Sequence, residues 1–159
     1  SSSRCLRRNP LLWLPLNGLL LWDLFFALRI ERWVYANVKK GTFTEGFISA
    51  DEVARMREGD CTEHAVLAAA MCRATGVPSR LAVGLAYVHH LRALVPHMWI
   101  EVWIDGRWYS LDPTLGQGHV PATHIKIAHH SWNDVQPLRP LIVYRSLLPH
   151  LTAEALRWE

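Results

Sequence analysis

A cysteine, a histidine and an aspartate lie in three local contexts that suit nucleophilic acyl chemistry. Cys61 lies within the sequence Gly-Asp-Cys-Thr-Glu-His-Ala (59–65), where Asp60 predicts a helix N-cap and Cys61 the first helical position. Unpaired backbone N–H groups and the helix dipole favour an anion at this position, and the thiolate is the reactive form of cysteine. The sequence therefore predicts Cys61 as a nucleophile, with its own backbone N–H placed to bind an oxyanion.

The histidine and the aspartate fall on the two strands of one predicted hairpin. The dipeptide Asp105-Gly106 is a strong signal for a two-residue turn between them. This turn sets Trp99 opposite Asp112 and His97 diagonal to Asp112 on the same face. One ring nitrogen of His97 can then bond the carboxylate while the other faces Cys61, which is the arrangement of a catalytic triad. The predicted register pairs Ile104 with Arg107, Val102 with Tyr109 and Ile100 with Leu111.

Four neighbouring side chains are expected to bind substrate or to support the reacting groups. Glu63 stands three residues after Asp60 and completes a capping box, and Trp99 lies beside the predicted triad. His64 follows Cys61 by one helical turn, so the pair also resembles half of a metal site. No second Cys-x-x-Cys or His-x-x-His pair completes a zinc shell. The sequence therefore predicts neither a metal ion nor a cofactor.

Each chemical interpretation has a structural alternative. Cys61 could be a buried inert thiol, His97 a polar residue at a strand start, and Asp112 a turn residue before Pro113. The other thiols, Cys5 and Cys72, are expected to be inert, and an odd number of cysteines does not indicate a disulfide framework. Five further histidines have no comparable context and are expected to be surface or packing residues: His119, His124, His129, His130 and His150.

Apolar periodicity and turn signals predict a chain of short helices and strands. Ser49 and Glu52 form a second capping box, and Gly76 with Pro78 ends the helix that begins at Cys61. The expected helices cover residues 28–40, 50–57, 61–74 and 152–158. The expected strands cover residues 80–88, 99–104, 108–111, 125–128 and 141–147, with a loop or hairpin tip over 89–95.

Length and charge favour a single globular domain with an additional segment at its N-terminal side. The 159 residues carry 17 Lys and Arg against 14 Asp and Glu, a net charge of +3 without a basic run, so no nucleic-acid partner is expected. Residues 11–28 hold nine leucines but also Pro15 and Asp23. We expect residues 1–28 to be a helical segment that packs on the domain or a partner, associates with a membrane or is a targeting remnant, and residues 29–159 to be the catalytic domain. The sequence leaves the location unknown between two candidates: the cytoplasm, or a membrane if residues 11–28 insert.

Over residues 29–128 the chain resembles the bacterial transglutaminase-like superfamily, whose core is related to papain-type cysteine peptidases. The resemblance implies an α+β fold, in which the helix bearing the nucleophile packs on an antiparallel sheet, here with an extra N-terminal helical segment. It also implies that Cys61 is the nucleophile, His97 the general base and acid, and Asp112 the residue that orients His97. The matching text is Phe47–Val53, Gly59–Ala65, Gly76–Arg80, His97–Val102 and Trp108–Thr114.

Such a site would act on a peptide or protein amide through a thioester intermediate. The resemblance favours hydrolysis, as by a peptidase or amidase, over transfer to an amine, as in protein-glutamine cross-linking by a transglutaminase. A third interpretation is a binding module that keeps the fold without turnover. No acidic cluster resembles the calcium sites of animal transglutaminases, and no upstream Gln supplies a second oxyanion donor.

Overall fold

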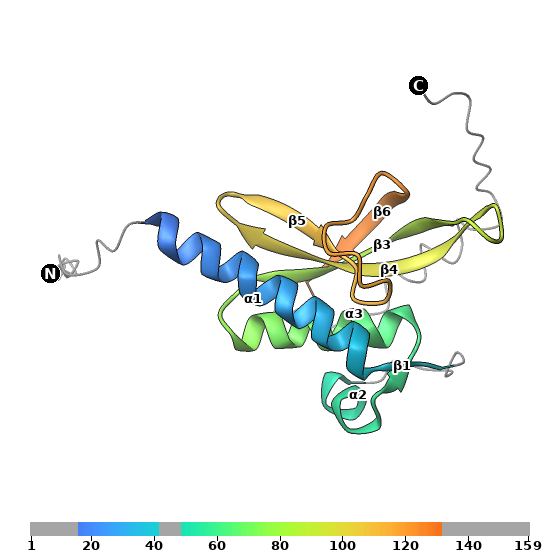
Figure 1. Ribbon diagram of the computed structural model, residues 1–159, viewed down its shortest axis with the longest axis horizontal. Coiled ribbons are helices and arrows are strands. Elements are labelled where there is room, and N and C mark those ends of the chain that lie inside the picture. Colours follow the sequence, from blue (N-terminus) through green and yellow to red (C-terminus); the bar gives the residue numbers. More distant parts are fainter. Residues whose placement is uncertain (1–15, 42–48, 132–159) are drawn as a thin grey trace, which may run out of the picture.

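A four-stranded antiparallel sheet is packed against helices on one side, in a computed structural model that describes residues 16–41 and 49–131 (Figure 1). The strand order is β5-β4-β3-β6, and two short strands, β1 and β2, pair in parallel at the other end of the molecule. This arrangement confirms the predicted α+β class. The predicted strand 141–147 and helix 152–158 lie outside the described residues. The elements are α1 (Leu16–Asn37), β1 (Lys39–Lys40), α2 (Ala50–Met56), β2 (Glu58–Gly59), α3 (Cys61–Ala74), β3 (Ser79–Val88), β4 (Ala93–Ile104), β5 (Arg107–Leu111) and β6 (His124–His130).

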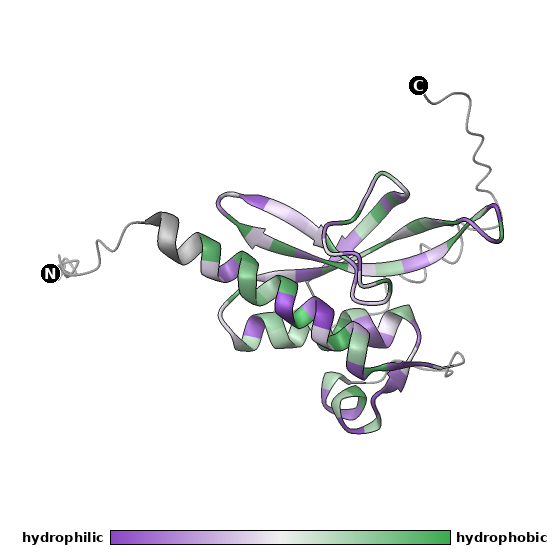
Figure 2. Ribbon diagram, in the orientation of Figure 1, coloured by the Kyte–Doolittle hydropathy of each residue, from purple (hydrophilic) through white to green (hydrophobic). Residues whose placement is uncertain are grey.

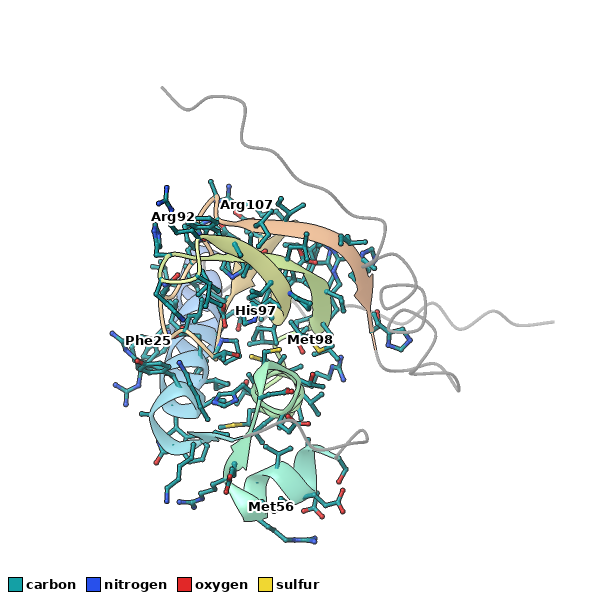
Figure 3. All side chains as sticks on the ribbon, turned by 90° about the vertical axis from the view of Figure 1, so that its right-hand side faces the viewer. Phe25, Met56, Arg92, His97, Met98 and Arg107 are labelled. Carbon is teal, nitrogen blue, oxygen red and sulfur yellow. The ribbon has the colours of Figure 1, made fainter. Side chains whose placement is uncertain are left out.

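Helix α1 is longer at its start and shorter at its end than the predicted helix over 28–40. It begins at Leu16 and ends at Asn37, because Lys39 and Lys40 instead pair with Glu58 and Gly59. Its buried stripe recurs every three or four residues, as expected for a helix that covers a core: Ala27, Ile30, Val34 and, just beyond the helix, Val38. Large apolar side chains, among them Phe25, point away from the molecule (Figure 3).

The division into a segment 1–28 and a domain 29–159 stays a prediction, although α1 runs through residue 28 without a break. Within the part of the chain that the structure describes, no helix combines the length and hydropathy needed to cross a membrane.

Helix α3 lies at the centre of the core and has the predicted bounds. Most of its residues are apolar (Figure 2), and its small side chains Ala65, Ala68 and Ala69 are almost fully buried. Small residues let the neighbouring backbones approach closely, so α1 and the sheet both pack on α3. The shared core also takes Val53 from the short helix α2.

The β4–β5 hairpin has the predicted register. Ile104 pairs with Arg107, Val102 with Tyr109 and Ile100 with Leu111. Asp105 and Gly106 both have positive φ, 50° and 74°, as the two central positions of a type I′ turn require.

The preceding connection is shorter than the loop predicted over 89–95. Strand β4 begins at Ala93, which pairs with Val88, so the turn covers only residues 89–92. Pro96 lies within β4, although proline cannot donate to a ladder. Strand β5 pairs with β4 only from Ile100 onward, so at Pro96 one side of β4 carries no strand among the described residues and the ring is tolerated.

Ile100 is fully buried in the centre of the sheet, and its truncation should destabilise the protein. Ile100→Ala leaves a cavity in a packed interior, so the free energy of unfolding should fall by about 2–5 kcal/mol in a denaturant titration. Ile125→Ala makes the same chemical change on β6, at a side chain that is 47% exposed, and should cost no more than about 1 kcal/mol. Equal losses in the two variants would contradict the central position of Ile100.

Candidate active site

Cys61 is the first residue of α3, where capping fixes the helix start. The Asp60 carboxylate accepts a hydrogen bond from the Thr62 N–H at 2.7 Å, and the Glu63 carboxylate accepts one from the Asp60 N–H at 2.8 Å. The predicted capping box is therefore confirmed. A side chain at Gly59 would collide with Glu63, since an added Cβ would lie 2.3 Å from the Glu63 Cβ. The cysteine is partly exposed, as a nucleophile must be.

His64 is buried beneath this helix start and connects it to the end of α1. Its Nδ1 lies 2.7 Å from the Asp60 carbonyl oxygen, and its Nε2 lies 3.2 Å from the Val38 carbonyl oxygen. A carbonyl oxygen can only accept, so whichever ring nitrogen of His64 carries a proton donates it to the carbonyl oxygen that it faces. The positions of Asp60, Glu63 and His64 thus agree with the predicted supporting role, which stays a prediction.

His97 and Asp112 meet as the hairpin register predicted. The Nε2 of His97 donates to Oδ2 of Asp112 at 2.7 Å. His97 lies between the sheet and α3 (Figure 3), and the Asp112 side chain is fully buried. The other carboxylate oxygen accepts from the backbone N–H groups of Thr114 and Leu115, at 2.8 and 3.1 Å. Both carboxylate oxygens are thereby held in place.

The two side chains form a charged pair, and His97 also interacts with the side chain of Cys61. Burial opposes the charged form of His97, but hydrogen bonds to Asp112 and Cys61, and attraction to both, raise its pKa to about 9. Burial also opposes the charged form of Asp112 and by itself would raise its pKa. Hydrogen bonds from His124, His97 and Thr114 instead hold that pKa well below its usual 3.8. Because Nε2 of His97 is taken by Asp112, Nδ1 is the nitrogen left for the thiol. The structure therefore brings Cys61, His97 and Asp112 together.

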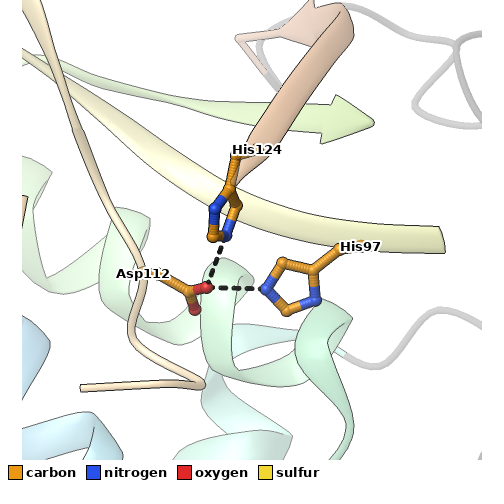
Figure 4. A group of neighbouring side chains, drawn as sticks. All are labelled: His97, Asp112 and His124. Carbon is orange, nitrogen blue, oxygen red and sulfur yellow. Dashed lines mark hydrogen bonds and ion pairs between the residues drawn. The ribbon is translucent and has the colours of Figure 1, made fainter. Parts of the chain in front are cut away.

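His124 is part of the same cluster, so the expectation that it is a surface or packing residue is wrong. Its Nε2 donates to the same Oδ2 of Asp112 at 3.1 Å (Figure 4), and its side chain is nearly inaccessible to solvent. The indole of Trp99 is stacked beside His97, with ring centroids 6.3 Å apart, and meets His124 edge-on at 5.1 Å. Trp99 thus forms an apolar wall against both imidazoles, in keeping with its predicted position.

Small residues of β3 allow the two histidines to meet across the sheet. His97 pairs with Gly84 on one side of this strand, and His124 pairs with Ala86 on the other. An added Cβ at Gly84 would lie 2.0 Å from the Ile125 carbonyl oxygen of β6, and the register shifts there. Glycine inside a strand often marks such a close backbone approach. Gly84 is therefore the residue of β3 that indicates a close approach by β6, the strand that carries His124.

Helix α1 fixes the loop that follows Asp112, a contribution that the sequence did not reveal. The Glu31 carboxylate accepts from the Gly118 N–H at 3.0 Å, and Nη1 of Arg32 donates to the Gly116 carbonyl oxygen at 2.6 Å. Glu31 is buried and close enough to Asp112 for the two carboxyl groups to interact electrostatically.

Three of these side chains could also hold a metal ion. One ligand atom each from His97, Asp112 and His124 lie within 4.8 Å of one another.

Comparison with known proteins identifies the family. The model of the transglutaminase-like superfamily matches residues 22–113, more than half of the chain, and the chain therefore belongs to this superfamily. The matched region contains Cys61, His97 and Asp112. No curated protein matches the chain.

Solved structures share the fold. The chain is 27% identical to a proposed cysteine protease from Cytophaga hutchinsonii, with a TM-score of 0.58 over 73% of this chain and 43% of that one. It thus spans less than half the length of the Cytophaga protein. Calcium-bound LapG from Legionella pneumophila is 16% identical, with a TM-score of 0.54 over 71% of each chain. A second LapG structure is 13% identical, with a TM-score of 0.56 over 85% of this chain and 84% of LapG.

Neutralising Asp112 should lower the pKa of His97. Asp112→Asn removes the negative charge that offsets the burial of the imidazolium, so the pKa should fall from about 9 by at least about one unit. NMR titration of assigned histidine ring resonances measures this change.

The matched control is Glu101→Gln, a second buried carboxylate on the same sheet, which is bonded to Arg80 and Lys126. This variant should leave the His97 titration in place. A pKa that stays near 9 in Asp112→Asn would show that the carboxylate is not what keeps the ring charged.

Proposed function

We propose that the chain hydrolyses peptide or other amide bonds through a thioester on Cys61. Family membership supports cysteine-based acyl chemistry in general, and the name given to the Cytophaga relative supports proteolysis in particular. The observation that carries the proposal is the position of His97, which is bonded to the buried Asp112 and interacts with the Cys61 side chain at a helix start. We therefore assign the nucleophile to Cys61, the base to His97 and the group that orients the base to Asp112.

The first half of the reaction forms the thioester. The Cys61 sulfur attacks the amide carbonyl carbon, and the backbone N–H of Cys61 binds the resulting oxyanion. Collapse of this tetrahedral intermediate breaks the C–N bond, and the proton on Nδ1 of His97 passes to the leaving amine.

The second half releases the acid. Water attacks the thioester carbonyl while Nδ1 of His97 takes a proton from it. The C–S bond breaks, the sulfur leaves as thiolate beside the imidazolium, and the carboxylic acid product departs. Asp112 stays ionised throughout, because its hydrogen bonds hold its pKa far below neutrality.

Cross-linking would use the same thioester with a primary amine in place of water. We favour water because the Cytophaga relative, 27% identical, is described as a proposed cysteine protease. The substrate class in either case is a peptide or protein amide.

Loss of the Cys61 thiol should abolish turnover and leave the fold intact. Cys61→Ala should lower amidase activity by at least about 1000-fold, with unchanged circular dichroism. Cys72→Ala is the matched control on the same helix: Cys72 is buried, and burial raises the pKa of its thiol to about 12, so it cannot supply the reactive thiolate. Activity that survives in Cys61→Ala and disappears in Cys72→Ala would overturn the assignment.

Thiol alkylation gives a second readout that needs no substrate. Iodoacetamide at pH 6 should label Cys61 and not Cys72 in mass spectra of peptides. His97→Ala should slow the labelling by at least about tenfold, because the imidazolium that stabilises the thiolate is lost.

The acceptor of the acyl group, water or amine, is identified with two peptides. One contains glutamine and the other contains a backbone amide bond that can be cleaved, and each is incubated with and without a primary amine. We expect free acid and cleaved peptide in both conditions, with little amine conjugate, as measured by mass spectrometry. Conjugate as the main product would replace hydrolysis by cross-linking. An acyl-enzyme mass on Cys61 would support the thioester in both cases.

A further inference from the structure

Two imidazoles and one carboxylate, from three separate segments, converge on one point beside Cys61. His97 on β4 and His124 on β6 both direct Nε2 at Oδ2 of Asp112, at 2.7 and 3.1 Å (Figure 4). A triad needs only the first of these contacts. The second histidine therefore gives the site a donor set that the proposed hydrolysis does not require.

This donor set matches a transition-metal ion. Zinc binds imidazole nitrogen at about 2.0–2.1 Å and carboxylate oxygen at about 2.0–2.2 Å. Tetrahedral ligands at such lengths stand about 3.4 Å apart, so the Nε2–Oδ2 separations need to open by less than about 1 Å. Two histidines and one carboxylate, with water in the fourth position, are a known ligand set of open zinc sites.

The surroundings of Asp112 favour the binding of a cation. Glu31 is buried nearby and interacts electrostatically with Asp112. The remaining ring nitrogen of His124 lies 3.1 Å from Oγ1 of Thr123, which can accept its proton once Nε2 binds a metal. A partner on the outer nitrogen is what fixes a metal-bound histidine.

We propose that Nε2 of His97, Nε2 of His124 and a carboxylate oxygen of Asp112 bind a divalent transition-metal ion, with Zn²⁺ as the probe. On binding, each Nε2 atom loses its proton and binds the ion through the freed lone pair. His97 keeps its proton on Nδ1 and releases the proton of Nε2 to solvent. His124 in its neutral form changes tautomer, so that its one proton lies on Nδ1. The Cys61 sulfur is not a ligand.

The consequence for catalysis rests on the proposed function. With the ion bound, His97 is neutral and carries its single proton on Nδ1, so it cannot take a proton from water. Asp112 is bound to the ion and no longer stabilises an imidazolium. Zinc binding thus switches hydrolysis off, and a chelator restores it.

The decisive experiment measures binding in the full chain carrying Cys61→Ala, so that neither activity nor the thiol is involved. Isothermal titration with Zn²⁺ should give one site with an affinity within about threefold of the unsubstituted chain. His124→Gln in the same background should weaken binding at least about tenfold. His119→Gln is the matched control, because His119 is an exposed histidine whose ring contacts the Ser110 carbonyl oxygen, and it should leave the affinity unchanged.

Two spectroscopic measurements, on the unsubstituted chain and on the Cys61→Ala chain, test the site without the His124→Gln variant. Co²⁺ added to the unsubstituted chain should give visible ligand-field bands without a sulfur-to-cobalt charge-transfer band. In the Cys61→Ala chain, Zn²⁺ should shift the ring ¹⁵N resonances of His97 and His124 and leave those of His119 in place.

Loss of zinc binding in Cys61→Ala, or a sulfur charge-transfer band, would overturn the proposal in favour of a thiol site. Equal affinity in folded His124→Gln would also overturn it. Hydrolysis assays in chelator test the proposed function separately, so that either result can fail without the other.

Discussion

The buried carboxylate of Asp112 is the constraint on which the site depends. An ionised carboxyl group without partners is very costly inside a protein, and Asp112 is fully buried. Four hydrogen bonds offset that cost: two come from the imidazoles of His97 and His124, and two from the backbone of Thr114 and Leu115. Strands β4 and β6 and the loop after β5 must all lie where these donors reach the carboxylate.

The positions of β6 and α1 follow from this requirement. Strand β6 approaches β3 closely enough for His124 to reach Asp112 only because Gly84 has no side chain. On the opposite side, Glu31 and Arg32 of α1 bond the backbone of residues 116–118 and hold the loop that carries Thr114 and Leu115. The family match covers residues 22–113, so Glu31 and Arg32 lie inside the matched region, and the loop that they bond follows directly after it.

Local signals in the sequence were sufficient to predict the helix position of Cys61 and the approach of His97 to Asp112. A capping box at Asp60 fixed the helix position of Cys61, and the Asp105-Gly106 turn fixed a register that sets His97 beside Asp112. Both signals depend on residues within a few positions of one another. The fold class was implied by the resemblance to a known family.

The missed contributions are long-range. His124 and Glu31 reach the site from segments distant in sequence, and neither has neighbours that repeat or cap in a recognisable pattern. Helix propensity also failed to predict where α1 begins and ends. The helix ends at Asn37 because Lys39 and Lys40 pair with β2. Gly84 alone hinted at the approach of another strand, and a single glycine does not say which strand that is.

Because Asp112 and His97 shift in opposite directions, the pair stays charged over a wide range of pH. The pKa of Asp112 is lowered, so its contribution to stability is present above its usual 3.8 and is lost only as pH falls through the lower folded value. The pKa of His97 is raised, so its contribution is present below 6.5 and is lost as pH rises through about 9. His124 helps to set the acid limit, since it donates one of the hydrogen bonds that keep Asp112 ionised. The second histidine therefore protects the charge on which the orientation of His97 depends, and the same contact completes the donor set for a metal ion. At the proposed metal site, a proton and a metal ion would compete for the same atom, Nε2 of His97.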